Sequence, residues 1–203
     1  GGHYLGKNDF WTLLKTKDNL LWASGWEPEA ENQVLFQIST FQNHFEHTPT
    51  GKRAMVFDED QDGGVWIGTE QGVFGHDVNQ SRDSFFNFVQ NTLRSVLITD
   101  LKFDQADNLW VGNRWGGAYF FDRQAMTYKL YEPEEPGKNG ISSSWQNVIL
   151  PIDERTTWIG SNQGLDLFNS KSGKFRHFTH DPSNLNSLSA NAIYSLLQDS
   201  NGR

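Results

Sequence analysis

The stretch DNLWVGNRWGG, residues 107–117, sets a tryptophan in a short apolar run between a turn-forming pair and two glycines. The pattern recurs three times along the chain, as DNLLWASG (18–25), DGGVWIGTEQG (62–72) and RTTWIGSNQG (155–164). The four tryptophans stand 44, 44 and 48 residues apart: Trp22, Trp66, Trp110 and Trp158. Self-similarity at a period of roughly 40 to 50 residues is typical of propellers and related repeat arrays, so this repeat frames the whole chain.

The composition favours short strands and tight turns. Hydrophobic residues make up 36% and aromatic residues 14% of the 203 residues, with 19 glycines and two methionines. The formal net charge is −8 and no cluster of Lys and Arg occurs, which argues against a nucleic-acid partner. The chain has no cysteine, which excludes disulfides and thiol chemistry. No apolar stretch approaches the ~20 residues of a membrane-spanning helix.

A hairpin turn is predicted before the tryptophans. Asp60 and Asp104 stand six residues before Trp66 and Trp110, each closing an apolar stretch, and Asp199 repeats that position near the end of the chain. The pairs that follow tolerate positive φ and predict two-residue type I′ hairpins: Asp18-Asn19, Asp62-Gly63, Asp107-Asn108 and Asn201-Gly202. The fourth copy departs, because DERTTW (153–158) lacks such a pair, and the turn there must be made differently.

Glycines follow the tryptophans at fixed spacing. The glycine two residues on lies within a strand, where the missing side chain permits close approach of a neighbouring backbone: Gly68, Gly112 and Gly160. The glycine six residues on marks the next turn: Gly72, Gly116 and Gly164. Two further segments of alternating apolar and polar residues then complete four short strands in each unit.

The sequence therefore predicts an all-β protein, a β-propeller of about four four-stranded blades that form an open arc of a larger ring. The whole chain is predicted to be one partial propeller, with repeat units at 10–53, 54–94, 95–140 and 141–189 and the first strand of a further blade at 190–203. We expect the repeated tryptophans to fill equivalent positions between blades, because a ligand would not need one in every repeat. The chain stops inside a hairpin turn, which would leave an unpaired edge, so we expect a piece of a longer protein.

Two adjoining stretches carry a resemblance to a known repeat. The segments WIGSNQGLDLFNSKSGKFRHFTHD (158–181) and DPSNLNSLSANAIYSLLQDSNGR (181–203) resemble the two-component regulator propeller repeat. That repeat has a Ser-Leu-Ser entry, an I-x-x-L-x-x-D strand, a D-x-x-G turn, L-W-I-G-T, and then G-L, F-D and T-G-x-F. The resemblance is strong over 141–203 and weak over 1–50, where ASGWEPEAENQ (23–33) replaces the usual G-T-x-x-G-L.

The resemblance implies a function. In that family such propellers form the extracytoplasmic, periplasmic sensor part of membrane-anchored bacterial receptors, with a histidine kinase, often a hybrid one, or a diguanylate cyclase as output. It implies a small-molecule ligand, frequently carbohydrate-derived, and a signalling domain downstream in the same polypeptide, in a receptor that can be a homodimer. It implies no chemistry of this segment's own, no cofactor and no direct membrane insertion.

The histidines do not predict a metal site. His44 and His47 have a spacing that a metal could use, but no second ligand pair accompanies them, and zinc needs three or four ligands. His177 and His180 lie in a predicted outer strand, where a spacing of three points them to opposite faces, and they are interpreted as surface residues. We therefore expect no metal.

No catalytic group stands out either. A glycosidase needs two carboxylates held across one bond, but the acidic stretches at 58–60 and 132–135 fall on a repeat column and on a Pro-Gly loop. Ser143 in ISSSW matches the entry to a blade and is interpreted as structural. The sequence predicts no catalytic residue.

Non-repeating residues on a repeating scaffold are the best candidates for a ligand site. The loop after the second strand and the entry before the next blade lie on the same face of a propeller, and loops on a rigid scaffold carry specificity. Arg114 and Trp115 stand in one such loop, where the repeat prefers small polar residues, and Trp145 and Gln146 stand in the entry of the following blade. Arginine can bind a carboxylate or sugar acid bidentately and tryptophan can stack on a sugar ring. The alternative is an ordinary surface contact between Arg114 and Trp115.

The sequence thus favours a ligand-sensing fragment of a membrane-anchored receptor. Two other classes stay open: a propeller hydrolase or lyase acting on polysaccharide, and a platform for protein interactions. Repeats identify scaffolds better than they identify functions.

Overall fold

The computed structural model describes residues 9–27, 32–39, 44–49, 53–76, 84–134, 139–199 and 201–202. The chain forms two compact units, residues 1–98 and residues 99–203. Four antiparallel sheets follow one another along the chain, each with its strands in sequence order, as in the blades of a propeller. The all-β prediction is confirmed, and the repeat boundaries drawn from the sequence stay a prediction.

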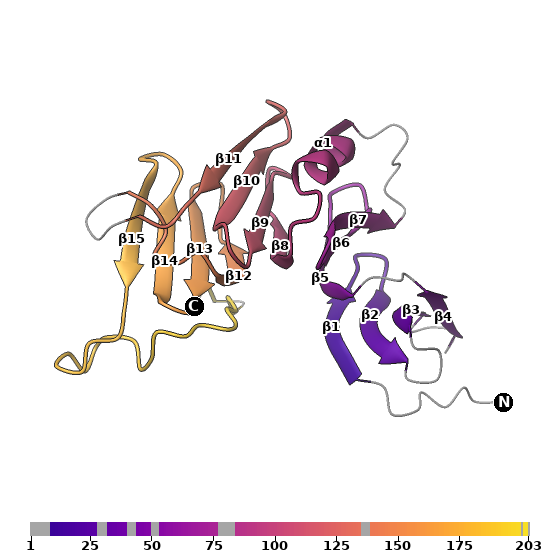
Figure 1. Cartoon of the computed structure of the whole chain (residues 1–203), viewed down its shortest axis with the longest axis horizontal. Helices are drawn as coiled ribbons and strands as arrows, with labels where there is room; N and C mark the ends of the chain where they lie inside the picture. Colours follow the sequence, from indigo (N-terminus) through magenta and orange to yellow (C-terminus); the bar gives the residue numbers. More distant parts are fainter. Residues whose placement is uncertain are drawn as a thin grey trace. The chain divides into compact units, whose positions relative to one another are not determined.

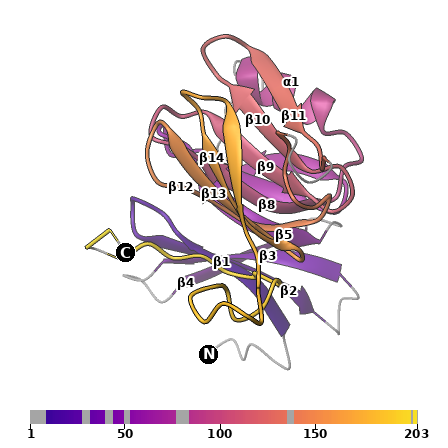
Figure 2. The same cartoon turned by 90° about the vertical axis from the view of Figure 1, so that its left-hand side faces the viewer.

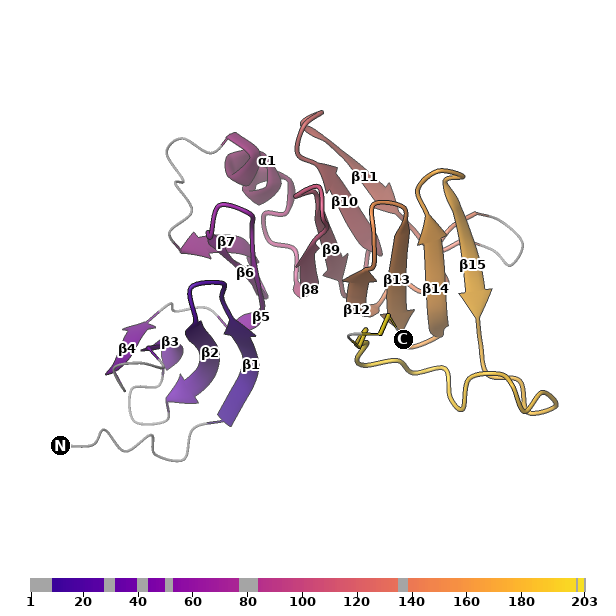
Figure 3. The same cartoon turned by 180° about the vertical axis from the view of Figure 1, so that it is seen from behind.

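The first unit contains a four-stranded sheet, a three-stranded sheet and a helix (Figure 3). Its elements are β1 (Asp9–Lys15), β2 (Leu20–Glu27), β3 (Asn32–Ser39), β4 (His44–Pro49), β5 (Ala54–Glu59), β6 (Val65–Thr69), β7 (Gly72–His76) and α1 (Ser84–Thr92). No helix among the described residues has the length and apolar character that crossing a membrane requires.

The second unit is built from two four-stranded sheets, in the orders β11-β10-β9-β8 and β12-β13-β14-β15 (Figure 1). Their strands are β8 (Ile98–Phe103), which begins at the boundary between the units, β9 (Leu109–Asn113), β10 (Ala118–Asp122), β11 (Thr127–Tyr131), β12 (Gln146–Pro151), β13 (Thr156–Ser161), β14 (Gly164–Asn169) and β15 (Lys174–Phe178).

The helix α1 was not expected from the sequence. Its segment, SFFNFVQNT, buries Phe85, Phe86 and Val89 on one face, and the Phe86 ring lies 4.8 Å from the ring of Trp66. Apolar residues three and four positions apart share a helix face, as Val89 does with Phe86 and Phe85. In a run of nine residues this helical period is hard to recognise among strands. The second sheet has three strands in the described residues rather than the predicted four.

The hairpin turns are not of type I′, and that prediction was wrong. In the turn before Trp66, Gly63 N–H donates to Asp60 O at 3.2 Å and Asp60 N–H donates to Gly64 O at 3.0 Å. Type I′ needs positive φ at both central residues, but here only Gly63 has it, at +88°. This is a three-residue loop with a left-handed third residue. The corresponding left-handed residues in the other copies are Asn19, Asp107 and Gly202.

The repeated aspartate explains this turn type. Asp60 Oδ1 accepts hydrogen bonds from Asp62 N–H at 3.1 Å and Gly64 N–H at 2.8 Å, and Asp60 Oδ2 accepts one from Trp66 Nε1–H at 2.8 Å. One carboxylate therefore closes the loop and fixes the tryptophan six residues later. In the fourth copy Ile152 N–H closes the turn on Thr156 O at 2.9 Å without a left-handed residue, so this turn is made differently, as the sequence predicts.

The repeated tryptophans form the cores of the two units. Trp110 is 2% exposed and packs with Tyr131, Ile149 and Phe168, so it lies between the third and fourth sheets. Trp22 packs equivalently against Ala54, Phe57, Val65 and Ile67 of the first unit. Trp158 is half-buried, with its ring 5.4 Å from that of Phe178, because the described residues after β15 form no sheet over it.

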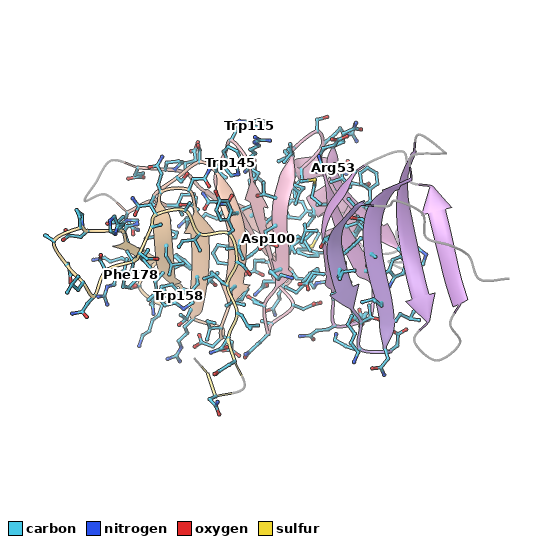
Figure 4. All side chains as sticks on the ribbon, turned by 90° about the horizontal axis from the view of Figure 1, so that it is seen from below. Arg53, Asp100, Trp115, Trp145, Trp158 and Phe178 are labelled. Carbon is cyan, nitrogen blue, oxygen red and sulfur yellow. The ribbon has the colours of Figure 1, made fainter. Side chains whose placement is uncertain are left out.

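A buried aspartate joins the inner strands of the second unit. Asp100, on β8, accepts hydrogen bonds from the N–H of Ile149 on β12 at 2.6 Å and from Leu101 N–H at 2.9 Å (Figure 4). A buried carboxylate needs such donors, because leaving it unpaired away from water is costly. The two inner strands are thereby fixed side by side.

The segment after β15 runs back past the ends of β12 and β13 as an irregular chain, shown in yellow (Figure 2). Ile193 N–H donates to Ser161 O at 2.9 Å, and the Ile193 side chain covers the glycine surface at Gly160. Residues 190–199 form no strand in this structure. The assignment of 190–203 to the first strand of a further blade stays a prediction.

Backbone contact at Gly164 should limit substitution there. Gly164 has φ +135°, and a Cβ on it would lie 2.5 Å from Phe178 O, whereas Gly173 has φ +65° with nothing within 4 Å. We expect Gly173→Ala to lower the free energy of unfolding by about 1 kcal/mol, for the left-handed conformation alone. Gly164→Ala should lower it by about 3 kcal/mol, because the backbone must also move. Urea unfolding of both variants measures the difference, and equal losses would contradict the contact.

Candidate functional site

The loop that carries Arg114 and Trp115 is one residue longer than its counterparts. The loops after β6 and β13 place two residues between a hydroxyl side chain and a glycine, whereas Arg114, Trp115 and Gly116 separate Asn113 from Gly117. The glycine with positive φ, +100°, is Gly117. The spacing from Trp110 predicted Gly116 as the turn glycine, and that prediction was wrong by one residue. The extra residue in the loop moves the turn to the adjacent Gly117.

The side chain of Asn113 holds this longer loop. Thr69 and Ser161 donate a hydroxyl hydrogen bond to the carbonyl of their glycine, at 2.9 and 3.1 Å. Asn113 Nδ2 donates in the same way to Gly117 O at 3.1 Å, and its Oδ1 accepts from the N–H of Trp115 at 3.0 Å. The amide group, longer than a hydroxyl, spans the extra residue with one donor and one acceptor.

Arg114 lies against two tryptophans. Its guanidinium carbon is 4.1 Å from the centroid of the Trp145 ring and 5.3 Å from that of Trp115. Both distances are within the range of cation–π contact. Figure 4 shows Trp115 and Trp145 together at one edge of the sheets, away from Trp158 and Phe178. The structure thus brings together three of the four residues predicted for the site.

The guanidinium of Arg114 lacks an acceptor. Among the described residues, it makes no hydrogen bond or ion pair, and its Nε is a buried donor without a partner. Trp115 is 70% exposed, so an apolar ring face stands beside this cation. Chemically the arrangement can bind an anion, with a flat apolar surface next to it for the rest of the ligand.

Gln146 lies beneath the site rather than in its wall. It is 0% exposed as the first residue of β12, and its Nε2 donates to Ser143 O. Its Oε1 is buried without a hydrogen-bond partner. We retain Gln146 as a residue that supports the loop, since its side chain has no surface that a ligand could reach.

The entry segment that carries Trp145 is fixed by a buried carboxylate. Asp166, 0% exposed on β14, accepts from Ser142 N–H at 2.8 Å and Ser142 Oγ–H at 2.9 Å. Its other oxygen is 2.6 Å from Nδ1 of His177 on β15. Farther along, Gly117 N–H donates to Ser144 O at 3.1 Å, which ties the entry segment to the Arg114 loop.

Sequence reasoning missed the role of His177. It was interpreted as a surface residue, but it pairs with buried Asp166. The signal was present in GLDLFN (164–169), where an aspartate takes an inward position between apolar residues. A buried aspartate requires donors, and the strand that follows was the place to look for them.

The described residues around this loop hold no cluster of metal-ligating side chains. In the described ranges, no group of three or more His, Asp or Glu side chains could hold a metal ion. Ser143 Oγ accepts from Trp145 N–H at 3.1 Å, which is a turn contact. The side chains of His44 and His47 lie outside the described residues.

We expect Asp166→Ala to loosen the entry segment. Removing the carboxylate leaves Ser142 without its acceptor and should cost about 3 kcal/mol of unfolding free energy, as for other broken buried pairs. The amide of Gly117 should also lose protection from hydrogen exchange, because its acceptor Ser144 lies on the released segment. Asp62→Ala, at an exposed turn of the first unit, is the control and should leave that amide unchanged. Unchanged exchange in Asp166→Ala would contradict the anchoring role.

No known family's sequence model matches the chain, and no curated protein matches it. Several solved structures match this chain. PorZ, an essential bacterial surface component of the type-IX secretion system of Porphyromonas gingivalis, matches 81% of this chain with a TM-score of 0.60 and 15% identity. The extracellular domain assigned to the hybrid two-component system BT3049 of B. thetaiotaomicron matches 99%, with a TM-score of 0.52 and 17% identity. Virginiamycin B lyase from Staphylococcus aureus matches 85%, with a TM-score of 0.53 and 11% identity.

The chain spans 26%, 32% and 56% of the lengths of these three proteins. At these identities the likeness shows the fold, which agrees with the resemblance to the two-component regulator propeller repeat. The three neighbours have different functions on one scaffold, so function has to be argued from the site.

Proposed function

We propose that this chain is part of the ligand-binding sensor propeller of a membrane-anchored bacterial signalling receptor. The resemblance of the repeats to the two-component regulator propeller and the likeness to an extracellular domain of a hybrid two-component system support the proposal. The segment then lies on the extracytoplasmic side, in the periplasm, and passes its bound state to a signalling domain in the same polypeptide, in a receptor that can be a homodimer.

The observation that carries the proposal is the guanidinium of Arg114. It lies 4.1 Å from the Trp145 ring and has no acceptor among the described residues. Arg114 is half-buried, and its Nε is a buried donor whose lost hydration is costly unless an acceptor compensates for it. A carboxylate delivered by a ligand supplies that compensation through two parallel hydrogen bonds.

The exposed ring of Trp115 suggests the rest of the ligand. A flat aromatic face beside a carboxylate-binding arginine suits a sugar acid, whose ring packs on the indole while its carboxylate reaches Arg114. We therefore propose an acidic carbohydrate as the ligand class.

The test measures by calorimetry the binding of D-galacturonate to the 203-residue chain, with D-galactose as its neutral counterpart. We expect the acid to bind at least about tenfold more tightly than galactose, which corresponds to about 1.4 kcal/mol. Arg114→Gln should remove this preference and Arg114→Lys should recover only part of it, because lysine cannot form the bidentate pair. Trp115→Ala should weaken both sugars alike.

Arg155→Gln is the matched control, since it removes one arginine from a turn at the other end of the same pair of sheets. It should leave the preference for the acid unchanged. Equal binding of the two sugars to the unmodified chain, or an unchanged preference for the acid in Arg114→Gln, would contradict the proposal.

A further inference from the structure

A cavity of about 320 Å³ lies between the third and fourth sheets, at the end of β9 opposite to the Arg114 loop. Asn108, just before β9, lines the cavity, whereas Asn113 at the other end of the strand holds the Arg114 loop. Five residues of strand separate these ends, a distance of roughly 16 Å at 3.3 Å per residue. The cavity is therefore separate from the proposed sugar site.

The inner wall of the cavity is aromatic. Trp110, Phe120, Tyr131 and Phe168 line it, and the rings of Trp110 and Tyr131 stack at 5.7 Å. The ammonium of Lys129, also in the lining, lies 4.7 Å from the centroid of the Tyr131 ring. This wall thus already accepts a cation of the chain's own, and the attraction arises from the negative face of the ring.

Tyr131 offers an unused polar group in this wall. It is 8% exposed, and its hydroxyl makes no hydrogen bond within the described part of the chain. Burial raises the pKa of Tyr131 to about 12, so the hydroxyl is neutral at physiological pH. This hydroxyl is therefore available to donate a hydrogen bond to a molecule in the cavity.

The mouth of the cavity is mainly acidic. Asp104, Asp122, Asp153 and Glu154 contribute carboxylates against two cations, Lys129 and Arg155. Asp122 Oδ1 accepts from Ala125 N–H and Asp153 Oδ1 accepts from Arg155 N–H, both at 2.7 Å. The second oxygen of each makes no hydrogen bond with the described residues. The carboxylate of Glu154 makes no hydrogen bond or ion pair with the residues that the structure describes.

The charged side of the mouth comes from the one turn that breaks the repeat. DER, residues 153–155, stands where the other copies have a turn whose third residue is left-handed: Asn19, Gly63 or Asp107. Ser170, the residue after β14, holds this turn: Ser170 N–H donates to Arg155 O at 2.8 Å and Ser170 Oγ–H donates to Glu154 O at 3.0 Å. The backbone of this turn is thus fixed, and its side chains line the cavity.

We propose that this cavity binds a small organic cation, an alkylammonium or guanidinium group whose carbon chain packs on the aromatic wall. The excess of carboxylates at the mouth attracts a cation, and the faces of Tyr131 and Trp110 hold it. The chemistry is shared by a free amine and by a lysine or arginine side chain of a peptide.

The first experiment titrates the 203-residue chain with n-butylammonium chloride and follows the indole N–H signal of Trp110 by nuclear magnetic resonance. Sodium butyrate, with the same carbon chain and the opposite charge, is the ligand control. We expect the amine to shift the signal with saturation and butyrate to leave it unchanged. A blocked peptide, acetyl-Ala-Lys-Ala-amide, distinguishes the sources: comparable binding favours a peptide side chain, and binding of the free amine alone favours a small molecule.

Variants test the mechanism. Glu154→Gln should weaken butylammonium by about threefold at low salt, the size of an exposed ion pair. Lys129→Met and Lys129→Gln should tighten it, because both remove the cation that occupies the ring of Tyr131. Asp62→Asn, at an exposed turn of the first unit, should have no effect.

Tighter butyrate than butylammonium binding, weaker amine binding in both Lys129 variants, or no response to either probe would overturn the proposal. Arg114→Gln should leave butylammonium binding unchanged, so this inference and the proposed sugar site can fail separately.

Discussion

The packing of Trp110 between two sheets is the contact on which the second unit depends. Its indole is almost fully buried among Tyr131, Phe120 and Phe168, which holds β9 of one sheet against the neighbouring sheet. Both ends of β9 are then fixed. One end presents Arg114 to Trp145 on the entry to the next sheet, and the other opens the aromatic cavity. A structural residue of the repeat thus positions two features that do not repeat.

Much of the fold could be predicted because each repeat column has a local cause. Asp60 binds the turn and the indole six residues on, so its spacing to Trp66 is visible in sequence. The finer geometry was not visible: the turn type depends on which residue takes positive φ, and Asp62-Gly63 suits both alternatives. The helix α1 was missed because its nine residues depend on packing against Trp66, a contact distant in sequence.

The candidate site was predictable where residues broke the repeat. Arg114, Trp115 and Trp145 stood out as bulky residues in loops that a propeller brings to one face, and the structure places them together. The pairing of Asp166 with His177 and the acidic cavity did not stand out, because each joins residues from different strands or sheets. Their residue types are ordinary for surface strands, and only the register of the sheets brings them into contact.

The most direct test of the account is a crystal structure of the chain with D-galacturonate. The account predicts the carboxylate of the sugar at hydrogen-bonding distance from the guanidinium of Arg114, with the sugar ring against Trp115 and the Arg114–Trp145 contact preserved. A crystal structure in which Arg114 pairs with a carboxylate of the protein itself, or in which the sugar binds away from this loop, would contradict it.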